Sequence, residues 1–262
     1  MSAWFAQFRV ISILAIVAVV MSGCANLPTP GTRLDADGLR NAIVSDHVDY
    51  VRAAVEARVA GVNERIPAPV YMEGTPLITI AARAGSVDVV RYLIKAGADI
   101  NARTPANETA LMLAVYFREE DPKSGNTSLE RHEKVAQLLV EAGATLENEP
   151  YNYTPLAYAA YQGHDHIIRY LLKRGARVNA DVVPGPAYVN TPLMMAAMQG
   201  NESTAVLLLR AGADARIRVE GGHTAAELAA KYSGNGMVPL LRCAERAGPG
   251  EGFLRVCENG GR

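Results

Sequence analysis

Hydrophobic positions along the chain fall in short blocks that recur at a regular spacing. Each block has an alanine-rich apolar stretch, a glycine, and a second apolar stretch whose apolar residues lie on one face of a helix. In three blocks the two glycines that follow these stretches are twelve residues apart, at Gly85 and Gly97, Gly163 and Gly175, and Gly200 and Gly212. Glycine readily adopts the left-handed conformation that ends a helix. The pattern therefore predicts pairs of short helices.

A threonine motif opens these blocks. Thr-Pro-Leu occurs at residues 75–77, 154–156 and 191–193, and the variants Thr-Ala-Leu and Thr-Ala-Ala occur at 109–111 and 224–226. Threonine can cap a helix, and proline fits its first turn, where the missing N–H costs nothing. Alanine pairs follow within the same stretches, and small side chains let helices stack closely. The first helix of each pair is therefore expected to begin at this motif.

These recurring motifs resemble the ankyrin repeat, and the resemblance covers about Glu73 to Ala230. It implies an all-α fold, an ankyrin-repeat solenoid of about six repeats with paired antiparallel helices and projecting hairpins. One repeat cannot bury its own apolar faces, so stability comes from its neighbours. Leu39 to Asn63 is expected to form a degenerate first repeat. His223 to Ala244 is expected to form a sixth, incomplete repeat, and both act as caps.

Two segments depart from the repeat length. From Thr109 to Gly143 the third repeat takes 34 residues, where its neighbours take 21. The surplus, Glu119 to Arg131, is predicted to be a polar loop between the paired helices. It has two interpretations, a functional loop or a tolerated insertion. Asp181 to Val189 lengthens the hairpin before the fifth repeat.

The amino terminus has the pattern of an export signal. The apolar run Val10–Val20 follows Arg9 and ends in small residues. Its eleven residues are short for a membrane-spanning helix, which needs about 20, and fit a secretory signal peptide. A transmembrane anchor from Trp4 to Met21 is the alternative.

The four residues Met21 to Cys24 resemble the bacterial lipobox, in which small residues precede a cysteine at the end of the apolar run. The resemblance implies cleavage after Gly23, a diacylglycerol on the Cys24 thiol and an acylated amino terminus. Several acyl chains give a firm membrane anchor. Ala25 after the cysteine favours the outer membrane, with the protein facing the periplasm.

Four regions are predicted. They are a signal peptide at residues 1–23, a lipidated cysteine with a tether at 24–35, the repeat array at 36–247 and a tail at 248–262. The tether can span only roughly 35 Å even when fully extended. The array is therefore expected to stay close to the membrane surface.

Cys243 and Cys257 are the two cysteines that remain. In an exported chain, a lone pair of cysteines predicts a disulfide, because the periplasm is oxidising. The expected Cys243–Cys257 bridge would pin the tail as a flap on the last helix. Two free thiols are the alternative.

Composition and motifs argue against catalysis and nucleic-acid binding. Lys and Arg number 26 against 27 Asp and Glu, with a net charge of −1 and no basic patch. His164 and His166, with His132 at the equivalent place one repeat earlier, are too few for the three or four converging ligands of a zinc site. The glycine-rich stretch Gly248–Gly252 follows no strand. We expect no metal, no cofactor and no enzymatic activity.

Exposed positions on the first helix of each pair, and the hairpins, are the candidate recognition residues. The two residues after each small-residue pair are free to vary, and several are tyrosines in a chain with only 6% aromatic residues. Tyrosine offers a large contact area with little loss of entropy. Packing of these rings against the long loop or a hairpin is the alternative. The predicted partner-binding residues are Arg83, Tyr116, Phe117, Tyr151, Tyr153, Tyr161, Gln162, Tyr188, Met198 and Gln199.

These expectations describe a membrane-anchored protein-protein interaction module of the bacterial envelope. Its expected partner is a protein in or entering the periplasm. Two roles suit it, that of an immunity protein that neutralises a secreted toxin, and that of an adaptor that protects or scaffolds a periplasmic protein. A host-directed effector is a further alternative, and the ankyrin fold by itself does not identify the partner.

Overall fold

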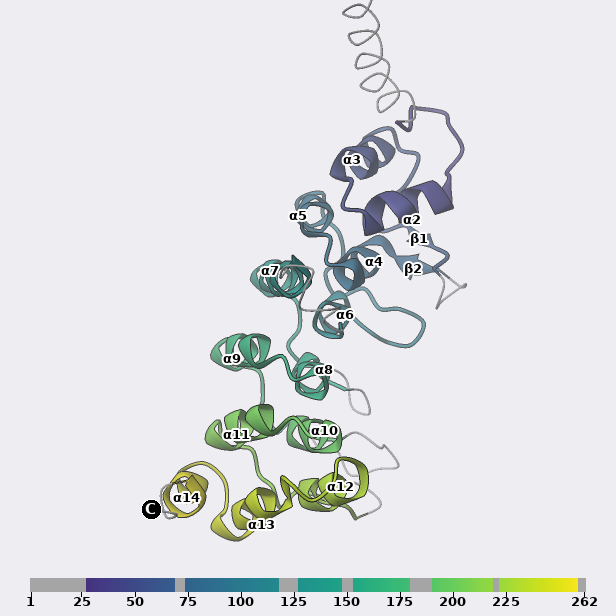
Figure 1. Cartoon of the computed structure of the whole chain (residues 1–262). Coiled ribbons are helices and arrows are strands. Elements are labelled where there is room, and N and C mark those ends of the chain that lie inside the picture. Colours follow the sequence, from purple (N-terminus) through teal and green to yellow (C-terminus); the bar gives the residue numbers. More distant parts are fainter. Residues whose placement is uncertain are drawn as a thin grey trace, which may run out of the picture.

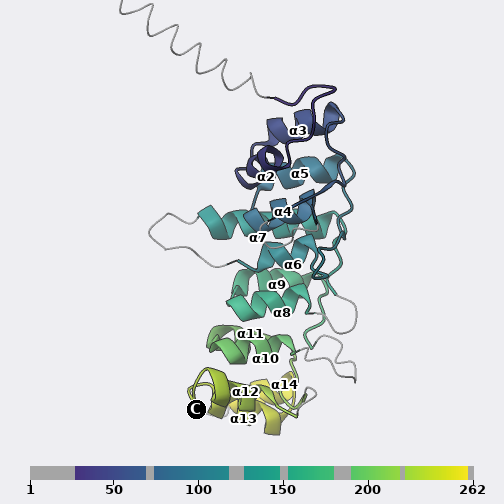
Figure 2. The same cartoon turned by 90° about the vertical axis from the view of Figure 1, so that its right-hand side faces the viewer.

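The computed structural model describes residues 27–68, 74–117, 127–147, 153–179, 190–218 and 222–258. In these residues, six helix pairs stack into an elongated array with an inner and an outer layer (Figures 1 and 2). The inner helices are α2 (Ala36–Val44), α4 (Leu77–Ala84), α6 (Ala110–Val115), α8 (Pro155–Gln162), α10 (Pro192–Gln199) and α12 (Ala225–Tyr232). The outer helices are α3 (Val48–Glu56), α5 (Val87–Lys95), α7 (Thr127–Glu141), α9 (Asp165–Lys173), α11 (Glu202–Arg210) and α13 (Val238–Ala247). The predicted all-α solenoid is confirmed.

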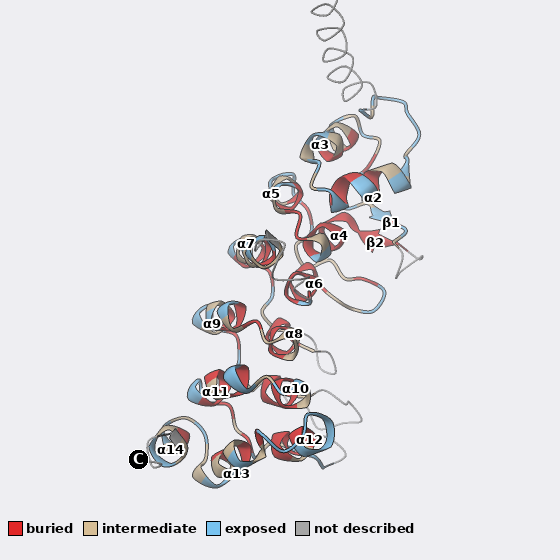
Figure 3. Cartoon of the chain, in the orientation of Figure 1, coloured by how far each residue is buried: buried red, intermediate tan, exposed pale blue. Residues whose placement is uncertain are grey.

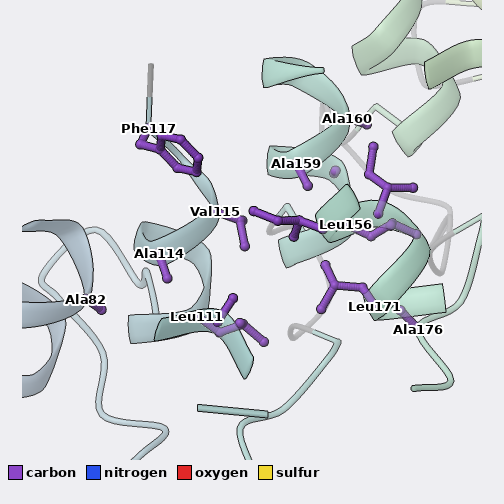
Figure 4. Packing of buried hydrophobic residues seen from close by; sticks show 14 of the residues in the cluster. Ala82, Leu111, Ala114, Val115, Phe117, Leu156, Ala159, Ala160, Leu171 and Ala176 are labelled. Atoms are coloured by element: carbon purple, nitrogen blue, oxygen red, sulfur yellow. The ribbon is translucent and has the colours of Figure 1, made fainter. Parts of the chain in front are cut away.

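The core is a continuous strip between the two layers. Figure 3 shows the buried residues on the helix faces that meet their neighbours, and Figure 4 shows leucine, valine and alanine side chains packed between α6 and α8. The alanine pairs of α4, α8 and α10 have no exposed surface. Small side chains thus let neighbouring inner helices approach closely, and each repeat buries its apolar faces only against the next.

Threonine caps four of the inner helices. The Oγ1 atoms of Thr109, Thr154, Thr191 and Thr224 each accept a hydrogen bond from the backbone N–H three residues later. These contacts satisfy N–H groups that the helix itself leaves unpaired.

Thr75 is different, because it lies in a short strand. β1 (Arg65–Ile66) pairs with β2 (Thr75–Pro76) in antiparallel register, with Ile66 opposite Thr75. The helix α4 therefore begins at Leu77, with Pro76 at its N-cap. The cap expected from the first Thr-Pro-Leu motif is not formed.

The turns between repeats form a ladder of hydrogen bonds. A side-chain oxygen at the end of one repeat accepts from a backbone N–H at the same place in the next repeat. The pairs are Asn63 with Asp99 (2.8 Å), Asn101 with Thr145 (2.9 Å), Glu147 with Arg177 (2.7 Å) and Asn179 with Asp214 (2.9 Å). The ladder fixes the register of consecutive repeats, and a glutamate replaces the asparagine at its third rung.

In the third repeat, the structure differs from the predicted end of the long loop. The predicted loop from Glu119 to Arg131 extends too far, because α7 begins at Thr127. The last five residues of that range are therefore helical and lengthen α7 to fifteen residues. The sixth pair, α12 and α13, also has both of its helices, although an incomplete repeat was expected.

The tail folds back onto the last repeats. It forms the short helix α14 (Glu251–Phe253) and a π-helical turn, η2 (Leu254–Glu258), and contacts α13 and α11. Phe253 is 1% exposed, and a disulfide joins Cys243 on α13 to Cys257. The tail thus covers the end of the apolar core.

The predicted signal peptide and Cys24 lie outside the described residues. Within the described ranges, no helix has both the length and the apolar character that a bilayer crossing needs.

Candidate functional site

Most of the predicted recognition residues that the structure describes lie where an inner helix ends. Arg83 is in the last turn of α4, Tyr116 is the C-cap of α6, and Tyr161 is near the end of α8. The inner helices stack side by side (Figure 1), so these positions at their carboxyl ends lie at one edge of the inner layer. Gln162, Met198 and Gln199 lie at the same ends of α8 and α10.

Tyr116, Tyr153, Tyr158 and Tyr161 form a tyrosine cluster on α6 and α8. The Tyr116 ring lies 5.2 Å from that of Tyr158, edge to face, and 6.2 Å from that of Tyr161. Tyr153 lies 5.9 Å from Tyr158. Tyr116 is 39% exposed, and the other three are half-buried. The cluster presents rigid aromatic surface to solvent.

Tyr158 is the member of the tyrosine cluster that the sequence interpretation missed. Tyr158 precedes the alanine pair of α8, whereas the predicted recognition positions follow such pairs. The signal was available, however, since residues three apart on a helix share a face. The spacing of Tyr158 and Tyr161 in the sequence of α8 satisfies that rule.

Phe117 corrects the predicted site, because it is buried rather than exposed. Its side chain is only 7% exposed and is stacked between two imidazoles, with ring centres 4.1 Å from His132 and 4.0 Å from His164. Its expected exposure assumed an inner helix of ordinary length, but α6 ends at Val115. The Phe117 ring therefore enters the core instead of facing a partner.

The histidines belong to a second ladder, in which polar side chains contact carbonyl oxygens at the ends of inner helices. A helix leaves its last four carbonyl groups without hydrogen-bond partners. Here a side chain of the following repeat is the partner of one or two of these carbonyl oxygens. The contacts are Ser86 Oγ to Val44 O (3.5 Å), His132 Nε2 to Arg83 O (3.2 Å), His164 Nε2 to Phe117 O (3.0 Å), Asn201 Nδ2 to Ala160 O and Tyr161 O (3.0 Å each) and Ser233 Oγ to Ala197 O (2.7 Å). This capping ladder holds the backbone of the candidate recognition residues in place.

His132 is buried in the capping ladder and has a carbonyl contact at each ring nitrogen. It is 4% exposed, and its Nδ1 lies 2.8 Å from the carbonyl oxygen of Ser128. Burial lowers the pKa of His132, and the charge of Arg131 acts in the same direction. The carbonyl groups of Ser128 and Arg83 oppose that shift, since they favour a protonated ring. On balance the pKa lies below its ordinary value, so the neutral ring is favoured at neutral pH, and in each tautomer that ring donates to only one of the two carbonyl oxygens.

The same contacts direct one ring nitrogen of each of two histidines at the backbone. The Nε2 atoms of His132 and His164 face backbone carbonyl groups, and His166 is exposed on the surface. In the part of the chain that the structure describes, no group of three or more His, Cys, Asp or Glu side chains converges.

The remaining predicted residues differ in their surroundings. Gln199 is exposed, and Met198 is half-buried, with its sulfur 3.5 Å from Asn190 Nδ2. Tyr151 and Tyr188 lie outside the described residues.

Comparison with protein families agrees with the geometry. A family model described as ankyrin repeats in three copies matches residues 39–122 and 126–182. A second, described as ankyrin repeats in many copies, matches residues 156–209. The chain therefore belongs to the ankyrin-repeat family. Like other members of that family, it is a protein-protein interaction module.

Two curated mouse proteins are similar to part of the chain. Protein fem-1 homolog A-like is 34% identical over 100 residues, which are 38% of this chain and 13% of that protein. Ankyrin repeat and SOCS box protein 16 is 38% identical over 105 residues, which are 40% of this chain and 22% of that protein. The chain spans less than a quarter of the length of either relative.

Proposed function

We propose that this protein is lipid-anchored in the bacterial envelope and binds a partner protein through the tyrosine cluster and the neighbouring inner-helix ends. The observation that carries the proposal is the tyrosine cluster itself, with Tyr116 exposed at its centre. Four aromatic rings in mutual contact, at the end of α6 and along α8, supply contact area that is formed before a partner arrives. Such preformed aromatic surface is typical of binding hot spots.

The backbone under the cluster is held by the capping ladder. Asn201 donates to the carbonyl oxygens of Ala160 and Tyr161, and His164 contacts that of Phe117, next to Tyr116. A surface ordered before binding loses less entropy when the partner arrives. The array therefore suits tight and long-lived capture rather than turnover.

The anchoring part of the proposal rests on the sequence from Met21 to Cys24. A lipid on Cys24 would hold the array within the length of the 24–35 tether, and α2 begins directly after it, at Ala36. The array would then meet its partner close to the outer membrane, in the periplasm. A Cys24→Ser variant should leave the membrane fraction. Unchanged fractionation would instead favour the apolar run as the anchor.

For the role within this class, we propose the neutralisation of a toxin that enters the periplasm. An anchored binder at the membrane surface meets such a protein as it arrives. In a co-expression assay, the immunity role requires that the protein protect cells against a secreted toxin encoded beside it. If the captured protein is a resident periplasmic one that keeps its activity, the role is that of an adaptor.

The binding surface is tested by affinity capture from envelope extract with the mature protein and the double variant Tyr116→Ala, Tyr161→Ala. We expect at least a tenfold loss of the captured partner. Tyr92→Ala is the matched control, since Tyr92 is a half-buried tyrosine on the outer helix α5. Equal capture by the folded double variant would exclude the tyrosine cluster as the binding surface.

A further inference from the structure

A cavity of about 580 Å³ opens on three consecutive inner helices, α2, α4 and α6. Its apolar wall includes Ile80 and Leu113, which are buried in the core, and Val44, which is 51% exposed. The volume falls in the range of about 300–1,000 Å³ that is usual for ligand pockets. None of the four tyrosines of the tyrosine cluster lines this cavity.

Both charged residues among those that line the cavity are arginines. Arg83 and Arg40 both line it, and none of its described lining residues carries a carboxylate. Arg40 is already engaged, because its guanidinium pairs with Asp37 at 2.7 Å and donates to the carbonyl oxygen of Pro67 at 3.0 Å. The sequences of α4, α6, α8 and α10 also contain no acidic residue.

Arg83 is the cation that remains available at this cavity. Its side chain is exposed, and among the described residues no ion pair or hydrogen bond to its guanidinium is found. Its backbone is fixed, however, since its carbonyl oxygen contacts Nε2 of buried His132. A positive charge on an ordered backbone thus lies beside an apolar cavity, which is complementary to a carboxylate that neighbours an apolar side chain.

We propose that the cavity receives an apolar side chain of a partner peptide segment, and that a carboxylate of the same segment pairs with Arg83. This proposal rests on the proposed function and specifies the chemistry of the partner. The segment is acidic and apolar, and its apolar residue acts as the anchor.

The spacing of the helices gives the length of the segment. Packed helices lie about 8–10 Å apart, so α4 and α8 are separated by roughly 20 Å. An extended chain covers that distance with about six residues. One segment can thus place its anchor in the cavity and contact the tyrosine cluster further along the same layer, which favours a peptide over an isolated small molecule.

The experiment selects random twelve-residue peptides, displayed on phage, on the full mature protein. We expect the enriched peptides to carry Asp or Glu within two positions of a large apolar residue. Synthetic versions should bind Arg83→Glu at least tenfold more weakly, and replacing the acidic residue of the peptide by Lys should restore binding to that variant. Ala84→Leu, which adds a side chain at the cavity wall, should also weaken binding at least tenfold.

Arg169→Glu is the matched control, since Arg169 is an exposed arginine on the outer helix α9, and it should change affinity less than twofold. Unfolding midpoints establish that all variants remain folded. The proposal is overturned if no peptides are enriched, if they lack an acidic residue, or if Arg83→Glu binds them normally. If the Tyr116 and Tyr161 variant loses its partner while Arg83→Glu retains both partner and peptides, only the cavity proposal fails. If the tyrosine variant retains its partner, the proposed function fails by itself.

Discussion

The second repeat, formed by α4 and α5, and the fourth repeat, formed by α8 and α9, begin with the same tripeptide but use it differently. In the fourth repeat, Thr154 caps α8 by accepting from the N–H of Ala157 at 3.2 Å. In the second repeat, β1 pairs with the strand that contains Thr75, and the Thr75 hydroxyl is left without a described partner. The same motif thus precedes α4 and α8 alike, but the threonine caps its helix only where no strand such as β1 pairs with it.

The two repeats also differ at the carboxyl ends of their inner helices. The end of α4 is held by the imidazole of His132, whereas the end of α8 is held by the amide of Asn201. The residues presented there are Arg83 and Tyr161 respectively. One repeat therefore presents a charge beside a cavity and the other an aromatic surface. The two repeats therefore share the same helical scaffold, while the residues at the ends of their inner helices give each a different surface chemistry.

The largest expected difference in stability is between variants of the two residues that contact the carboxyl ends of α4 and α8, His132 and Asn201. His132→Ala should lower the free energy of unfolding by about 3 kcal/mol, because it removes a buried ring stacked on Phe117. Asn201→Ala should lower it by about 1 kcal/mol, because it removes only hydrogen bonds of a half-buried amide. Urea unfolding measures both changes. His132→Phe keeps the ring and should fall between them, whereas equal losses for the two alanine variants would contradict the comparison.

A smaller difference is expected at the glycines that end the two helices. Gly85 and Gly163 both have positive φ, 67° and 79°, where alanine costs about 1 kcal/mol. At Gly85 an added Cβ would lie 2.8 Å from the His132 ring, against 3.2 Å from Asn201 at Gly163. Gly85→Ala should therefore destabilise the protein by about 1 kcal/mol more than Gly163→Ala. Thermal unfolding measures the pair, and the reverse order would show that the imidazole moves aside.

Replacing Thr154 and Thr75 by valine should change the free energy of unfolding in opposite directions. Thr154→Val removes a cap and should destabilise the protein by about 1 kcal/mol. Thr75→Val removes a buried hydroxyl that lacks a described partner, so it should be neutral or stabilising by up to about 1 kcal/mol. The serine variants at both sites keep the hydroxyl and serve as controls in the same urea titration. Destabilisation by Thr75→Val would mean that its hydroxyl has a partner in solution.

The smallest expected difference is in pH dependence, because only the group that holds α4 titrates near neutral pH. The folded state lowers the pKa of His132 below the value of about 6.5 in an unfolded chain. The unfolded state therefore binds more protons below that pH, and this contribution to stability is present above about 6.5 and lost as the pH falls. Hydrogen exchange should accordingly report a greater loss of protection in α4 than in α8 between about pH 7.5 and about pH 5.5. The His132→Phe variant should abolish this difference, and its persistence would assign it to another group.

Much of the fold could be predicted, because its determinants are local. The threonine caps, the alanine pairs and the glycines that end helices each act within one turn of chain, so their order in the sequence is their order in the structure. The candidate site could be predicted only in part. Tyr116 and Tyr161 follow from their place after a small-residue pair, while Phe117 occupies an equivalent place and is buried. The burial of the Phe117 ring depends on two histidines that are 15 and 47 residues further along the chain.

The repeat, the two helices of each unit and the cysteines available for the tail disulfide follow from the amino-acid sequence alone, because each of these depends on residue types at fixed short spacing. The tertiary structure decided which aromatic rings face solvent, why Thr75 does not cap its helix, and where Arg83 and the cavity come together. Those outcomes depend on side chains from three different repeats meeting at one place. The spacing of these residues in the sequence does not predict this contact, because the contact depends on how the repeats stack.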